Sequence, residues 1–215
     1  MNFLLISPED ERKLSELRNT VKARLGEKRY SHTLSVERTA YELASHLLPD
    51  NAYDICVAAL LHDVTKEMSI DEHIDILDGA GITVTDEDMT TPGILHSFSA
   101  DIYCRKNFSE YVNNDILSAI KNHTVGSNSM SVFDKIIFIS DFIEETRKYE
   151  ACINLRKLLI SEISEAESCD DKKRALTKAC LLAIEATEKS LIAKVAPVNS
   201  RMLLTKASLL EELKR

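Results

Sequence analysis

The chain has 215 residues, of which 44% are hydrophobic and 29% charged, a balance that supports a folded core and excludes a largely disordered protein. Its 35 acidic residues outnumber its 27 lysines and arginines, and the net charge of −8 without a long basic run excludes the usual electrostatic footprint of a protein that binds nucleic acid. Five glycines and four prolines are too few for the repeated tight turns of a many-stranded sandwich or barrel.

Helical patterns with recognisable ends begin near the N-terminus. Ser7 and Pro8, followed by three acids, predict the start of a first helix, and Gly26 predicts its end. The amphipathic pattern over 29–48 predicts a second helix. The shorter, almost wholly apolar run over 54–62 predicts a third, which should be buried at the centre of the fold.

A capping box and a loop-like segment come next. Ser69, followed by Glu72, has the spacing that begins a further helix. Two glycines and a Pro-Gly pair flank the acidic stretch 86–88, which predicts a loop there. Further helices are expected over 95–107, 114–123, 131–145, 151–167, 171–194 and 200–213. The best strand candidate, VFDKIIFISDFI, has the length and apolar spacing of a buried helix, so we predict a single all-α domain.

Cysteine usage and the N-terminal residues indicate where the protein resides. The five cysteines are scattered and form no CxxC pair, which is typical of reduced, mostly buried thiols. The N-terminal MNFLLISPEDERK has a short apolar patch but no basic segment before it, so it is a poor signal peptide. No stretch approaches the ~20 apolar residues that span a bilayer. These features predict a soluble, cytoplasmic protein without a membrane partner.

Several histidines and acids occur where a buried helix should be apolar. His62 and Asp63 end the run AALLHD, and Asp141 interrupts IIFISDFI. An ionised carboxylate in an apolar run costs several kcal/mol unless it is paired or binds a metal. The ends of other helical patterns also carry histidines: His32, His96 and His123. Any one of these residues alone is more often an ordinary buried polar residue, but the whole set predicts a metal site.

The order of these residues resembles that of a known family. His32, the His62-Asp63 pair and Asp141 look like the H…HD…D signature of the HD superfamily of metal-dependent phosphohydrolases, and two further histidines resemble its two-metal branch. More narrowly, the chain resembles the YqeK family of symmetrical diadenosine tetraphosphate hydrolases. The similar blocks cover nearly the whole chain: KRYSHTLSVERTAYELA, AALLHDVTKE, GILHSFSA, NHTVGSNSMSVFDKIIFISDFIE and APVNSRMLLTKASLL.

The resemblance implies a fold, a reaction and a cofactor. The fold would be an HD-domain helical bundle over 1–215, with a core of about 18–150, helices over 151–215 packing on it and the metal site inside. The reaction would cleave diadenosine tetraphosphate into two ADP by attack of a metal-bound hydroxide on phosphorus. The cofactor would be two iron ions, with manganese or a similar transition metal as the alternative. The implied metal ligands are His32, His62, Asp63, His96, His123 and Asp141.

The same resemblance suggests residues for catalysis and substrate binding. Asp63 would bridge the metals, and Lys66, three residues later and on the same side of the chain, would act with it. The expected contacts to the dinucleoside polyphosphate are Arg29, Lys66, Thr124, Gly126, Met130 and Arg147. His46 and His73 match no block and are predicted to lie on the surface.

The chain departs from the family at three places, and other functions remain open. It reads Glu-Glu-Thr-Arg over 144–147 where the family commonly has Glu-Pro-Gly-Arg, it has Val125 where a threonine is frequent, and 161–171 looks like an insertion. The alternatives are an HD phosphohydrolase acting on nucleoside monophosphates, other dinucleotides or alarmones, a non-catalytic nucleotide-binding module, and an oxygenase with the same two-iron framework. The oligomeric state is open, with a homodimer as one option.

Overall fold

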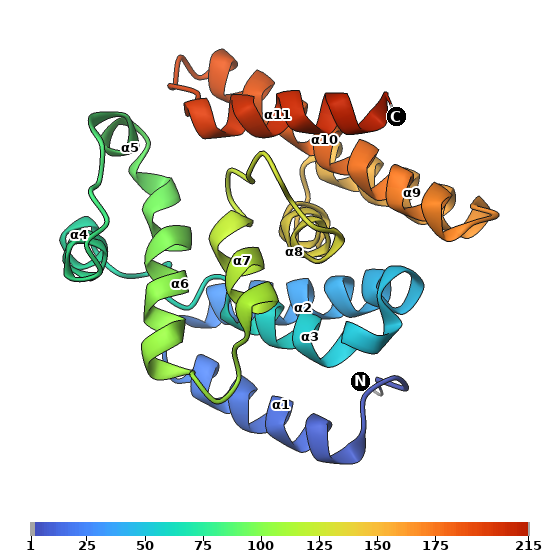
Figure 1. Ribbon diagram of the computed structural model, residues 1–215, viewed down its shortest axis with the longest axis horizontal. Coiled ribbons are helices and arrows are strands. Elements are labelled where there is room, and N and C mark those ends of the chain that lie inside the picture. Colours follow the sequence, from blue (N-terminus) through green and yellow to red (C-terminus); the bar gives the residue numbers. More distant parts are fainter. Residues whose placement is uncertain (1–2, 215) are drawn as a thin grey trace.

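The computed structural model describes residues 3–214, is built from helices, and has no strand in this range (Figure 1). The all-α prediction is therefore confirmed. Residues 1, 2 and 215, which belong to the predicted domain, lie outside the described residues. The α-helices in chain order are α1 (Pro8–Lys22), α2 (Glu27–Leu47), α3 (Ala52–Leu61), α4 (Ile70–Gly79), α5 (Asp86–Thr90), α6 (Leu95–Asn107), α7 (Asn114–Asn122), α8 (Val132–Ile143), α9 (Glu150–Glu165), α10 (Cys169–Ala193) and α11 (Ser200–Leu213).

Helices α3 and α8 occupy the middle of the molecule. In Figure 1, α1 lies on one side and α9, α10 and α11 on the other, with α2 and α3 between them and α8 seen end-on near the centre. Helix α3 packs against α1, α2, α7 and α8, and α8 packs against α2, α7, α9 and α10. Because both helices are covered on several sides, most of their residues are buried, which explains their almost continuous apolar sequences.

Local signals located most helix ends correctly. The side chain of Ser7 accepts a hydrogen bond from the Asp10 N–H at the start of α1. Ser69 and Glu72 form the predicted capping box at the start of α4. The prediction for Gly26 was wrong: α1 ends at Lys22, and Gly26 is the N-cap residue of α2, with its N–H donating to Glu67.

The predicted loop over 86–88 is instead the short helix α5. Thr85 and Asp88 form a capping box that begins it, a signal that the surrounding glycines and proline obscured. The start of α11 also holds α5 in place, because Ser200 donates to Glu87 and the Arg201 guanidinium lies 3.2 Å from an Asp88 carboxylate oxygen. A segment that reads as a loop is therefore ordered by contacts with residues far away in the sequence.

The prediction that His73 lies on the surface was also wrong. Its side chain is buried, and its Nδ1 lies 2.8 Å from the hydroxyl oxygen of Ser99 on the neighbouring helix α6. Four of the five cysteines are buried, and Cys169 is exposed. Among the described helices, none combines the length and the apolar character that crossing a bilayer requires.

Gly126 offers a test of how tightly α11 packs on the rest of the fold. Its φ of +70° lies in the left-handed region, and a Cβ atom there would be 2.5 Å from Cγ2 of Thr205 in α11. Gly81 has a similar φ of +72°, but a Cβ there would meet nothing within 4 Å. The two glycines therefore share a backbone constraint and differ in the packing around them.

We expect Gly81→Ala to lower the free energy of unfolding by about 1 kcal/mol, the cost of placing alanine in the left-handed region. Gly126→Ala should cost about 1–3 kcal/mol more, because the added methyl group overpacks the contact with α11. Urea unfolding of both variants measures the difference. Equal losses would mean that α11 moves away at no cost.

Candidate metal centre

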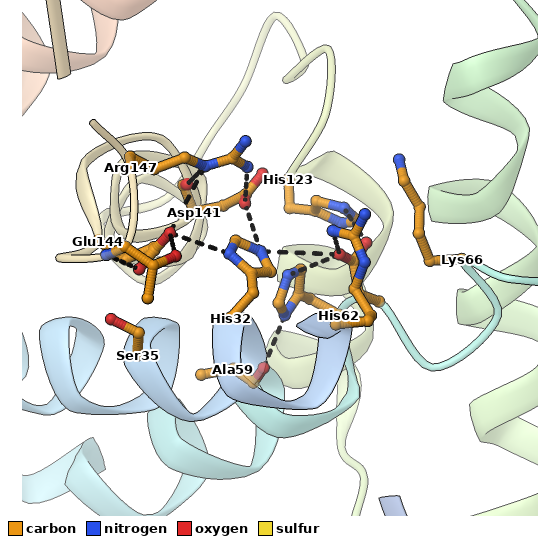
Figure 2. A network of polar contacts seen from close by, with 12 residues as sticks. His32, Ser35, Ala59, His62, Lys66, His123, Asp141, Glu144 and Arg147 are labelled. Carbon is orange, nitrogen blue, oxygen red and sulfur yellow. Dashed lines mark hydrogen bonds and ion pairs between the residues drawn. The ribbon is translucent and has the colours of Figure 1, made fainter. Parts of the chain in front are cut away.

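The helical bundle brings the six predicted ligand residues into one buried cluster. His32 lies on α2, His96 on α6 and Asp141 on α8, whereas His62 and His123 are the residues that directly follow α3 and α7. Figure 2 shows the rings of His32, His62 and His123 next to one another, with Asp141 at the same place. Five helices far apart in the sequence thus deliver imidazole and carboxylate groups to a single point.

Asp63 lies at the centre of the cluster. Its Oδ1 is 3.2 Å from Nε2 of His96 and 3.6 Å from Nε2 of His123. Its Oδ2 is 3.4 Å from Nε2 of His62 and 3.7 Å from Nε2 of His32. Burial raises the pKa of Asp63, but the surrounding histidines, His62 above all, outweigh it and hold this pKa well below its usual value. Each oxygen of an ionised carboxylate therefore faces two imidazoles, as a bridging ligand would.

Backbone contacts fix the orientation of three of the four rings. The Nδ1 atoms of His62, His96 and His123 each lie 2.6 Å from the carbonyl oxygen of the residue three positions earlier. Because a carbonyl oxygen only accepts, each Nδ1 carries the proton and donates it, and the lone pair of a neutral ring is then on Nε2. The Nε2 atoms, which point into the cluster, are therefore free to bind a cation.

The inner nitrogens lack the partners that buried polar atoms normally have. Among the described residues, Nε2 of His62 is buried without a hydrogen-bond partner, and Nε2 of His32 is buried and faces only the carboxylates of Asp141 and Asp63. Nε2 of His96 lies 2.9 Å from Nε2 of His123, a distance at which two lone pairs repel unless a proton or cation lies between them. Orphaned imidazole nitrogens beside two carboxylates are the donor set that transition metals prefer, so the residues fit a bound metal.

The fourth ring, that of His32, is oriented by a carboxylate. Its Nδ1 lies 3.1 Å from Oε1 of Glu144, a side chain without solvent exposure, and its Nε2 lies 3.0 Å from Oδ1 of Asp141 (Figure 2). Burial lowers the pKa of His32, but hydrogen bonds to Asp141 and Glu144 outweigh it and raise this pKa to about 9. Glu144 was not predicted as part of the site, although a carboxylate at the end of an apolar helix, three residues after Asp141, was the available signal.

Thr146 completes the surroundings of Glu144. Its N–H and hydroxyl both donate to the Glu144 carboxylate, at 2.6 and 2.5 Å. Burial raises the pKa of Glu144, but hydrogen bonds from His32 and Thr146 lower it to about 2, so this carboxylate is ionised at neutral pH. Thr146, one of the two residues at which this chain departs from the Pro-Gly pair, therefore donates hydrogen bonds to Glu144, which orients His32.

We expect Glu144→Gln to weaken metal binding about 10- to 100-fold, the usual effect of losing a partner that orients a metal-binding histidine. Glu145→Gln is the matched control, because the Glu145 side chain is 64% exposed and pairs with Arg38 at the surface. Competition titrations with a metal chelator give both affinities. If the two variants bind metal equally well, Glu144 does not orient a ligand.

Cationic side chains surround the cluster on two sides. Nη1 of Arg29 lies 2.8 Å from Oδ2 of Asp63, and Nη2 of Arg147 lies 2.8 Å from Oδ1 of Asp141. Lys66 lies on the other side, with Nζ 3.1 and 3.2 Å from the two ring nitrogens of His96, and burial lowers its pKa. The departure over 144–147 therefore leaves Arg147 beside the cluster.

Arg156 on α9 holds the turn that carries Arg147. Its guanidinium donates to the backbone carbonyl oxygens of Ile143, the last residue of α8, and of Glu144 and Arg147 in the turn that follows. These contacts fix the turn between α8 and α9, which in this chain lacks the Pro-Gly pair common in the family.

Three other residues that were predicted to bind substrate lie in different places. The hydroxyl oxygen of Thr124 is 3.2 Å from Nε2 of His96, so Thr124 belongs to the site. Gly126 and Met130 are buried, and a Cβ atom at Gly126 would lie 3.2 Å from Sδ of Met130 and 2.5 Å from Cγ2 of Thr205 in α11. Neither lines the cavities beside the cluster, so their contact with substrate stays a prediction.

Three cavities adjoin the cluster. The first, of about 590 Å³, includes His32 in its lining and four cationic side chains, Lys28, Arg29, Arg147 and Lys148. The second, of about 420 Å³, is lined in part by Asp141 and Arg147. The third, of about 220 Å³, is lined in part by Lys66 and His96. Lys28 and Lys148 were not predicted as site residues, because exposed lysines have no distinctive pattern in a sequence.

Sequence comparison relates the chain to a family of known proteins. The sequence matches the HD domain family over residues 29–167. It is 31% identical over 146 residues to the symmetrical bis(5'-nucleosyl)-tetraphosphatase of Bacillus subtilis, covering 68% of this chain and 77% of that protein. It is 30% identical over 148 residues to the protein of the same name from Halalkalibacterium halodurans, covering 68% of this chain and 76% of that protein.

A solved structure extends the likeness to the whole fold. The crystal structure of a predicted HD superfamily hydrolase involved in NAD metabolism from Clostridium acetobutylicum superposes with a TM-score of 0.80 at 29% identity, covering 92% of this chain and 97% of that one. The chain therefore belongs to the HD domain family. Within it, the chain belongs with the YqeK-like proteins named symmetrical bis(5'-nucleosyl)-tetraphosphatases, so the predicted family and the enzyme class, an HD-type phosphohydrolase, are confirmed.

Proposed function

We propose that this protein hydrolyses diadenosine tetraphosphate symmetrically, giving two molecules of ADP. The observation that carries the proposal is the convergence of four imidazole Nε2 atoms and two carboxylates on one buried point beside a cavity with four cationic side chains. The names of the relatives support the choice of a dinucleoside tetraphosphate over other nucleotides.

We propose two iron ions as the cofactor. Two groups of donor atoms, each lying within 4.8 Å of one another, could hold them: His32, His62 and Asp141, and His62, Asp63 and His123. Nε2 of His96 lies 3.2 Å from Oδ1 of Asp63, so His96 could add a further ligand to the second group. Imidazole and carboxylate ligands suit iron and also manganese. When bound, such ions polarise a phosphoryl oxygen and lower the pKa of water.

The side chains around the cluster would bind and orient the polyphosphate. The chain carries a net charge of −8, so a polyanion needs a local region of opposite sign. Arg29 and Arg147 supply it on the His32 side, and Lys66 supplies it on the His96 side. The water oxygen forms its bond to phosphorus as the bond to the opposite bridging oxygen breaks. Because the leaving ADP ends in a phosphate with a second pKa of about 6, its departure needs no proton donor.

Symmetrical cleavage requires room for a nucleoside diphosphate on each side of the reacting phosphorus. The 590 Å³ cavity opens on the side of His32 and the 220 Å³ cavity on the side of His96. A tetraphosphate chain that crosses the cluster between them would place its central bond beside Asp63.

Hydrolysis of di-, tri-, tetra- and pentaphosphate-linked diadenosines by the iron-loaded enzyme in ¹⁸O-labelled water tests the proposal. We expect ADP as the sole nucleotide product from the tetraphosphate, with one labelled oxygen for every two ADP. Formation of ATP and AMP would contradict symmetrical cleavage. Turnover of nucleoside monophosphates or alarmones in place of dinucleotides, or metal binding without any turnover, would contradict the proposed function.

A further inference from the structure

Two of the cavities beside the metal centre meet at one aromatic side chain. The 590 Å³ and 420 Å³ cavities share two lining residues, Arg147 and Tyr149. Tyr149 is the N-cap residue of α9, and it is 73% exposed, the one aromatic residue among the strongly exposed large apolar side chains of residues 3–214. With so little of its ring covered, Tyr149 contributes little to the hydrophobic core. Its position at the junction of two cavities suggests a ligand as its partner.

The two cavities differ in chemistry. The 590 Å³ cavity is lined by four cationic side chains, which suits phosphate groups. The 420 Å³ cavity lies between the end of α8, the start of α9 and α10, and its wall includes the apolar side chains of Phe142, Ala186 and Leu191. The hydroxyl groups of Thr187 and Ser190 add polar positions to this wall. An apolar cavity of this size with a few polar groups is typical of a site for a small organic ligand.

We propose that the 420 Å³ cavity binds one nucleobase of the substrate, which stacks on the ring of Tyr149. This assignment rests on the proposed function and deepens it, because it names the place of one nucleoside. Arg147 lines both cavities and also pairs with Asp141, so it connects the base site to the metal centre. The diphosphate attached to the base would pass along Arg147 and Lys148 toward the cluster.

Binding of ADP and of inorganic diphosphate to the metal-loaded enzyme separates base contacts from phosphate contacts. We expect Tyr149→Ala to weaken ADP binding about 5- to 150-fold, the range that stacking of a base on an aromatic ring provides, and to leave diphosphate binding unchanged. Tyr149→Phe keeps the ring and should bind ADP as the wild type does. Lys148→Ala should weaken binding of both ligands. Calorimetry gives all the affinities.

A second variant tests the opposite wall. Ala186 lines the 420 Å³ cavity but not the 590 Å³ cavity, so Ala186→Phe should weaken ADP binding and spare diphosphate binding. Equal ADP affinity in the wild type, Tyr149→Ala and Ala186→Phe would overturn the assignment.

Kinetics distinguish this assignment from the proposed function. If the wild type converts diadenosine tetraphosphate to ADP and Tyr149→Ala does so with an unchanged KM, the base site is wrong and the function stands. If the wild type has no such activity but its ADP affinity depends on Tyr149, the function is wrong and the nucleotide site stands.

Discussion

Asp63→Asn will reduce the hydrolysis of diadenosine tetraphosphate by about 10³-fold or more. The carboxylate of Asp63 faces the Nε2 atoms of four histidines, so its loss removes the group that joins both halves of the cluster. A metal ion supplies several kcal/mol of transition-state stabilisation, and each 1.36 kcal/mol corresponds to a tenfold change in rate. The metal content of the purified variant, measured by mass spectrometry, should fall together with the activity.

Asp101→Asn is the matched control for this substitution. Asp101 is also a buried aspartate, it lies on the same helix as His96, and it pairs with Arg105 at 2.9 Å, outside the cluster. The control should keep its metal content and activity. If Asp63→Asn retains wild-type activity, Asp63 has no part in the mechanism.

Loading the metal-free protein with Fe²⁺ or Mn²⁺ will raise its melting temperature by about 8–16 °C. A ligand present at 1,000 times its dissociation constant stabilises the folded state by about 4.1 kcal/mol, and each kcal/mol shifts the melting temperature of a protein of this size by about 2–4 °C. The effect should be large because Nε2 of His62 is buried without a hydrogen-bond partner and the Nε2 atoms of His96 and His123 face each other at 2.9 Å. Scanning calorimetry under anaerobic conditions measures it.

Two controls define the specificity of this shift. Mg²⁺ prefers oxygen ligands and keeps much of its water, so it should give a much smaller increase. Asp63→Asn should lose most of the response to Fe²⁺. The absence of any shift with Fe²⁺ or Mn²⁺ in the wild type would show that the cluster does not bind these metals.

The sequence predicted those features that depend on neighbouring residues. The capping box of Ser69 and Glu72 is a local signal for the start of a helix. The apolar run of α8 is longer than a typical strand, and its length therefore indicated a buried helix. The six candidate ligands were recognisable because acids and histidines in apolar helices need partners. Their convergence on one point was inferred through the family resemblance, because sequence spacing alone does not bring His32 and Asp141 together.

Features that depend on the tertiary fold were missed. His73 is buried because α4 packs against α6, which nothing near His73 in the sequence reveals. Glu144 orients His32 only because the end of α8 meets α2. Tyr149 resembles any exposed residue until the two cavities beside it are known. The left-handed φ of Gly126 and the tight approach of Thr205 in α11 to this glycine were not predicted either.

The contacts between α11 and α5 connect the carboxyl end of the chain to the metal centre. Ser200 and Arg201 hold Glu87 and Asp88, and a short turn leads from α5 to the helix that carries His96. Residues beyond the HD match, which ends at residue 167, therefore position one of the inner imidazoles. Limited proteolysis that trims the last helix is expected to cost the enzyme part of its metal occupancy, and a bulky fusion at that end carries the same risk.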